Sequence, residues 1–302
     1  MTMRISTRIL FAFIVGLLLG VVAPARPILS TGQDAKTPPA GQNTTGQQSG
    51  AAGQASSAPA VTADERQAFA AVQSESSAGL DPDRVITLAQ DFEKKFPNSA
   101  YLTYAYFFEA NAYEAKGDFD KLIDAGEKSI KLNADNLMTL IMMSTILPQP
   151  QAMKGNDLDK QKKLTEAEAD ANRALELIDK LPKQPSEADD AFKKRIDTVK
   201  SEPHAALGMI HLQRASMVLT GGMDPDELAK AATEYKQSVD MTPQPLPQNY
   251  YRLGEVYMHE NKVPDAIAAF SKASELGQGS PIQEFADKQI EALKKLQTPA
   301  KP

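Results

Sequence analysis

The sequence predicts an all-α fold. Helical periodicity and helix-start signals recur from residue 64 to residue 297, and no segment alternates convincingly as a strand does. Asp81, Asp224 and Ser280 each precede a proline, so a capping side chain stands just before the first helical residue. Asp224 and Ser280 are also followed three residues later by Glu227 and Gln283, as in a capping box. We expect about twelve helices of ordinary length.

Residues 1–25 have the three parts of an export signal. Arg4 and Arg8 precede a run of 14 apolar or small residues, Ile9–Val22, and an Ala-Pro-Ala sequence follows as the cleavage signal. A helix of that length would span about 21 Å, which is less than the roughly 30 Å of a bilayer core. We therefore expect a cleaved signal peptide, with an uncleaved N-terminal membrane anchor as the alternative. Either reading places the rest of the chain outside the cytoplasm, and we expect the periplasm.

Residues 26–63 are predicted to be a disordered linker. From residue 30 to residue 61 the chain consists almost entirely of Gly, Gln, Ser, Thr, Ala and Pro. This composition offers no periodic apolar face, so burial cannot offset the entropy of ordering the chain. The helical domain is predicted to cover residues 64–298.

Composition and missing motifs exclude several classes of function. The 302 residues include no Cys, which excludes a disulfide scaffold, a thiolate zinc site, an iron–sulfur cluster and cysteine catalysis. The net charge of −6 argues against a nucleic-acid partner. The chain has no HExxH zinc motif, no GxxxxGK[ST] phosphate loop and no GxSxG nucleophile elbow. We therefore expect a protein that is not an enzyme, with no catalytic residue, metal or cofactor.

Residues 247–280 contain two helical faces with a distinctive spacing. Their apolar and small residues stand at positions 4, 7, 8, 11, 20, 24 and 27 of the segment: Tyr250, Leu253, Gly254, Tyr257, Ala266, Phe270 and Ala273. Small residues at positions 8 and 20 let two antiparallel helices approach closely, and large residues at 4, 11 and 24 fill the space around that contact. This spacing resembles the tetratricopeptide repeat (TPR) family. The resemblance implies a right-handed α-solenoid of stacked helix-turn-helix repeats.

The same frame fits other segments less closely. A copy at residues 103–136 has Tyr106, Ala110 and Tyr113 in its first helix, a further copy has His204 and His211, and a weaker one lies between them. A partial repeat precedes all of these, which gives about four to five repeats. His204 and His211 fall at positions 4 and 11, so we interpret them as packing residues rather than as a metal pair.

The third and fourth copies depart from the frame. Each has 11 extra residues at the turn between its two helices, and both insertions should project from the same edge of a solenoid. Residues 182–200 are also surplus. We predict one more helix over Ser186–Lys200, which Pro203 would end or kink.

The resemblance further implies a concave groove, lined by positions 2, 5, 9 and 12 of each first helix. In this chain those positions, with one neighbour, give Tyr104, Phe107, Asn111, Glu114, Met138, Ile141, Met209, Leu212, Tyr251, Glu255, Met258 and His259. Met is adaptable and Tyr is a good anchor, so such a surface suits a protein or peptide ligand. The alternative is that extra helices or the insertions cover the groove.

The function that the resemblance implies is a non-enzymatic scaffold or assembly factor of the cell envelope. It would bind a protein or peptide segment through its repeats, and membrane contact is expected only through an uncleaved N-terminal segment. The alternative is a binder of a small ligand in a pocket closed by the repeats. A deep concavity with convergent polar groups would favour that alternative over an open trough.

Overall fold

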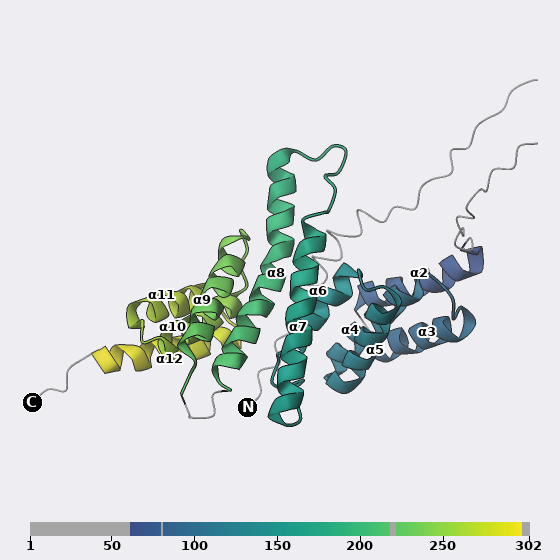
Figure 1. Ribbon diagram of the computed structural model, residues 1–302. Coiled ribbons are helices and arrows are strands. Elements are labelled where there is room, and N and C mark those ends of the chain that lie inside the picture. Colours follow the sequence, from purple (N-terminus) through teal and green to yellow (C-terminus); the bar gives the residue numbers. More distant parts are fainter. Residues whose placement is uncertain (1–60, 80, 218–221, 298–302) are drawn as a thin grey trace, which may run out of the picture.

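The computed structural model describes residues 61–79, 81–217 and 222–297, which form helices and connecting turns without a strand (Figure 1). The predicted signal segment and residues 26–60 lie outside the described residues. The helices of the described part are α2 (Ala63–Ala78), α3 (Pro82–Lys95), α4 (Leu102–Lys116), α5 (Phe119–Leu132), α6 (Leu137–Ile146), α7 (Asp157–Ile178), α8 (Asp189–Ala215), α9 (Pro225–Asp240), α10 (Pro247–His259), α11 (Val263–Leu276) and α12 (Pro281–Gln297).

Helix starts follow the capping signals of the sequence. α3 begins at Pro82, and the carboxylate of Asp81 accepts hydrogen bonds from the backbone N–H groups of the next turn. α9 begins in the same way after Asp224. α2 begins one residue before the predicted domain boundary, because Thr62 and Glu65 form a reciprocal capping box there.

The helices pack as consecutive hairpin pairs: α2 with α3, α4 with α5, α6 with α7, α8 with α9, and α10 with α11. α12 packs against α11 at the C-terminal end. First helices of neighbouring pairs also touch at three junctions, where α2 meets α4, α6 meets α8 and α8 meets α10. The structure is therefore an α-solenoid of helical repeats, as predicted, with the first helices on a common side. None of its described helices has the length and apolar character needed to cross a membrane.

Close contact between the helices of a pair depends on glycine at position 8. A Cβ atom on Gly254 of α10 would lie 2.8 Å from the ring of Phe270 in α11. A Cβ atom on Gly208 of α8 would lie equally close to the ring of Tyr235 in α9. Both rings are almost completely buried. The predicted packing of a small residue against a large one is thus confirmed in the last two pairs.

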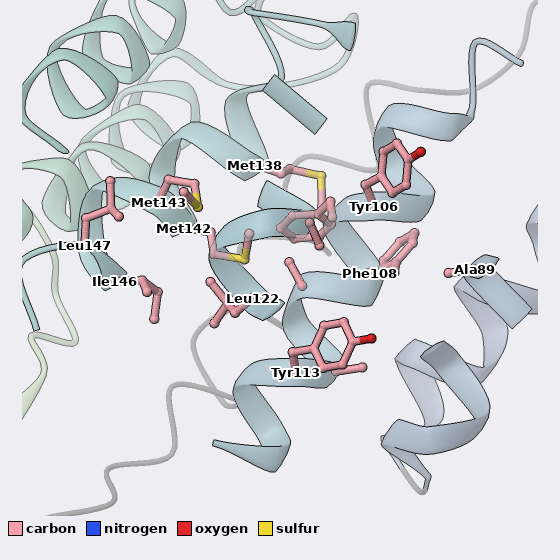
Figure 2. Close-up of a cluster of buried hydrophobic side chains, with 14 of the residues drawn as sticks. Ala89, Tyr106, Phe108, Tyr113, Leu122, Met138, Met142, Met143, Ile146 and Leu147 are labelled. Carbon is pink, nitrogen blue, oxygen red and sulfur yellow. The ribbon is translucent and has the colours of Figure 1, made fainter. Parts of the chain in front are cut away.

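The largest part of the core joins α4, α5 and α6, whose side chains converge in Figure 2. Gly126 stands where the repeat frame expects an aromatic residue, and a Cβ atom there would lie 2.3 Å from the sulfur of Met143. Met143 of α6 therefore fills the space that, in the last two pairs, is filled by the aromatic ring at position 24 of the second helix. α6 has apolar residues on every side, and eight of its ten residues are buried.

α8 corrects the prediction of a separate helix over Ser186–Lys200. A single helix of 27 residues runs from Asp189 through Pro203 to Ala215. Pro203 cannot donate to the carbonyl of Val199, which costs the helix one hydrogen bond. Packing on both sides of the proline offsets this loss. Val199 packs with Ala174 and Ile178 of α7, and Leu207 and Ile210 join the main core.

The two insertions occupy the connections before α7 and before α9. In Figure 1 both α7 and α9 begin at the lower edge of the molecule, so the connections lie on the same side. The first connection is tied back to the solenoid, because Nζ of Lys154 lies 2.8 Å from the carboxylate of Asp120 in α5. Part of the second connection, residues 218–221, lies outside the described residues.

Candidate binding surface

Three predicted groove residues lie in the core. The exposed fractions of Phe107, Ile141 and Met138 are 0%, 1% and 7%. The prediction that they line an open groove is wrong, because all three are buried, and α8 packs against α6, the helix that carries Ile141 and Met138. At the end of α6, Gln213 of α8 donates a hydrogen bond of 3.2 Å to the carbonyl of Pro148. The alternative of a covered groove is therefore correct for this part of the solenoid.

The N-terminal part of the predicted groove is a half-buried aromatic group. Phe69 of α2 stacks on Tyr101 with 4.6 Å between ring centroids, and Tyr104 lies 6.3 Å from Phe69. The side chain of Asn111 donates to the carbonyl of Phe107 in its own helix, at 3.1 Å. Glu114, one turn further on, is half-buried.

The C-terminal part of the predicted groove is an apolar strip across α8 and α10. We define the C-terminal strip as Met209, Leu212, Tyr251 and Met258, all of which are half-buried. The first two side chains pack against the core between α8 and α10, and the other two pack against the core around α11. The inner side of the strip is therefore held in place by packing on the core, and its outer side is partly exposed to solvent.

Polar groups border this strip. In α10, Nη1 of Arg252 donates to Oε2 of Glu255 at 2.7 Å, and His259 at the helix end is exposed. Burial is the largest cause that raises the pKa of the Tyr251 hydroxyl, while its hydrogen bond to Gln289 of α12 acts in the opposite direction. The strip thus combines an apolar centre with both signs of charge at its edge.

Three buried polar groups near the strip were not predicted. Glu202 of α8 is 7% exposed and has no hydrogen-bond partner among the described residues. Burial raises its pKa to about 7. The side-chain oxygens of Tyr235 and Gln248 are completely buried without a partner in the described structure, whereas the carboxylate oxygens of Glu202 are not among the completely buried atoms. The repeat frame could have identified Glu202 and Gln248, because both stand at groove position 2 of their copies.

The two histidines of α8 occupy packing positions, as interpreted from the sequence. Nδ1 of His204 lies 2.7 Å from Glu234 of α9, and Nδ1 of His211 lies 2.7 Å from Glu227 of the same helix. Each histidine therefore joins the two helices of its pair through a different glutamate. The described residues contain no group of three or more His, Asp or Glu side chains that could hold a metal ion.

Comparisons of sequence found no matching family model and no matching curated protein. Comparisons of structure found helical-repeat proteins. TTC0263, a thermophilic TPR protein of Thermus thermophilus, is 14% identical, with a TM-score of 0.46 over 76% of this chain and 99% of that one. A MamA RS-1 ArsTM double mutant is 12% identical, with a TM-score of 0.45 over 72% and 96%. The TPR domain of P58(IPK) is 17% identical, with a TM-score of 0.30 over 78% and 65%.

The repeated contacts of the chain itself decide the fold type. Glycine at position 8 against a buried ring at position 24 recurs in successive pairs, through Gly208 with Tyr235 and Gly254 with Phe270. The fold is of the TPR type. Its first helices carry two partly open parts of the predicted groove, the half-buried group around Tyr104 and the C-terminal strip.

Proposed function

We propose that this protein is a non-enzymatic TPR-type scaffold that binds a protein or peptide segment. The observation that supports this proposal is the C-terminal strip, where half-buried Met, Leu and Tyr side chains lie across two adjacent helices. Flexible Met side chains adapt to a ligand, and Tyr supplies a rigid contact area. A helix or an extended segment of a partner could dock on such a face.

The proposed place of action is the cell envelope, outside the cytoplasm. The support is the pattern of residues 1–25, with its two arginines, apolar run and small residues. N-terminal sequencing of the protein from isolated envelopes tests this part. A mature chain that starts near residue 26 supports export with cleavage, and an intact N-terminus in the membrane fraction supports an anchor. Recovery only from the cytoplasm would contradict the proposal.

The binding function is tested by crosslinking in intact envelopes. The variant is Tyr251→Ala with Met258→Ala, which shortens two side chains of the C-terminal strip. The matched control is Leu132→Ala with Leu158→Ala, because these leucines are 55% and 78% exposed on other helices. We expect a partner that both the wild type and the control capture and that the strip variant loses. Equal capture by all three would place the interface elsewhere.

A further inference from the structure

Glu202 lies on the side of α8 between two neighbouring first helices. Val199, one turn before it, belongs to a cluster with residues of α6 and α7, while Ala205, one turn after it, belongs to a cluster with residues of α9 and α10. Met209 of the C-terminal strip follows two turns after Glu202 on the same side of the helix. The carboxyl group of Glu202 therefore belongs to the face that carries the strip.

No ion pair with another described residue compensates this carboxyl group. α6 has no charged residue, and Asp170 lies on the side of α7 where Glu166 approaches α5. Charged groups of the helices around α8 are engaged with other partners, in the pairs Glu168–Arg214, Asp179–Lys200, Glu227–His211, Glu234–His204 and Glu255–Arg252. Burial is the cause that raises the pKa of Glu202.

An ionised carboxylate in this place is costly for the folded protein. Burying a charge without a partner disfavours the charged form and destabilises the fold. Glu202 makes no described hydrogen bond that would offset this cost. A group that destabilises the free protein and lies beside a binding face has the signature of a ligand contact.

We propose that Glu202 binds a lysine or arginine side chain of a peptide segment that lies on the C-terminal strip. This inference rests on the proposed function and names the chemistry of the partner. An ammonium or guanidinium group supplies the donors that the carboxylate lacks, in a charge-assisted hydrogen bond. Gln248, at the equivalent position of α10, adds a buried side-chain oxygen that also lacks a donor. The net charge of −6 favours a basic segment as well.

A positional-scanning library of dye-labelled octapeptides tests this proposal by fluorescence anisotropy, with the full chain as receptor. The peptide termini are acetylated and amidated, so that only side chains carry charge. We expect the wild type to prefer Lys or Arg over Gln at one position by about tenfold. Glu202→Gln and Glu202→Met should lose that preference and keep the apolar preferences. Asp190→Asn, which removes an exposed acid of the same helix, should retain it.

The outcomes separate this inference from the proposed function. Binding by the wild type without a basic preference overturns the role of Glu202 but leaves peptide binding intact. A basic preference that persists in both Glu202 variants also overturns it. If the wild type binds none of the peptides, the proposed function fails, and the inference with it. In the supporting case the preference should weaken from pH 8 to pH 6 in the wild type only, because protonation removes the charge of Glu202.

Discussion

The hydroxyl oxygen of Ser129 in α5 lies 2.8 Å from the hydroxyl oxygen of Thr139 in α6, at the junction of two repeats. These residues stand at position 27 of one copy and position 3 of the next. The same two positions meet between α9 and α10, where the side chain of Asn249 donates to Ser238 at 2.9 Å. A buried polar contact therefore recurs at two junctions and fixes how one pair stacks on the next.

Ser129→Ala should destabilise the protein by about 2 kcal/mol, because it leaves buried partners unsatisfied. The hydroxyl of Ser129 donates to the carbonyl of Thr103 at 2.8 Å and accepts from the amide of Asn136 at 3.1 Å. Urea unfolding measures the change. In the control Ser271→Ala, an exposed hydroxyl bonded within its own helix is removed, and stability should barely change. Equal effects of the two substitutions would contradict a role of Ser129 at the junction.

Gly254→Leu should destabilise the protein by about 3 kcal/mol, because the added side chain overpacks the contact with Phe270. Thermal unfolding followed by circular dichroism measures the effect. Ala268→Leu places the same side chain at an exposed position of α11 and should leave the melting temperature nearly unchanged. An unchanged melting temperature for Gly254→Leu would show that the close contact of α10 with α11 does not form.

Phe107→Ala should cost about 3–5 kcal/mol of stability, as for other fully buried aromatic residues. Its position in the sequence predicted a ligand contact, whereas its burial predicts a loss of folding. Denaturant unfolding separates the two, with Leu158→Ala as a control at a side chain that is 78% exposed. A stable Phe107→Ala variant with weakened partner binding would restore the groove interpretation.

The fold was predictable because its signals are local. Gly254 and Phe270 meet within one repeat, so the spacing of one segment reveals their contact. The covered groove was not predictable, because it depends on contacts between distant parts of the chain. Gln213 reaches Pro148 across 65 residues, and the apolar residues on every side of α6 indicate its burial without showing which distant helix covers it.

Contacts between distant parts of the chain also explain why the helix continues through Pro203 and why Glu202 is buried. A proline ends most helices, but packing of α8 against α7 and the main core maintains the helix on both sides of this one. Glu202 stands at groove position 2 of its copy, so the sequence places it on this face but does not show its burial. Only its burial without a partner distinguishes it from the exposed acids of the same helix.

Arg195 of α8 connects the helix to the loop that follows α7, and this connection should depend on pH. Its Nε and Nη2 atoms donate to Glu187 at 2.8 and 2.9 Å, and Nη2 also donates to the carbonyl of Pro182 at 3.0 Å. Arg195 lowers the pKa of Glu187 from 4.5 to about 2. A lowered carboxyl pKa contributes stability that is present above pH 4.5 and is lost as the pH falls toward 2.

Glu187→Gln should therefore have a lower melting temperature than the wild type at pH 7, and the difference should shrink between pH 4.5 and pH 2.5. Faster cleavage of the loop at residues 179–188 in limited proteolysis at pH 7 should accompany it. Asp189→Asn is the control, because its pair with Lys183 involves a carboxylate side chain that is 94% exposed. Its removal should change neither measurement, since exposed pairs contribute little. A difference for Glu187→Gln that stays constant down to pH 2.5 would mean that the ion pair does not hold this loop.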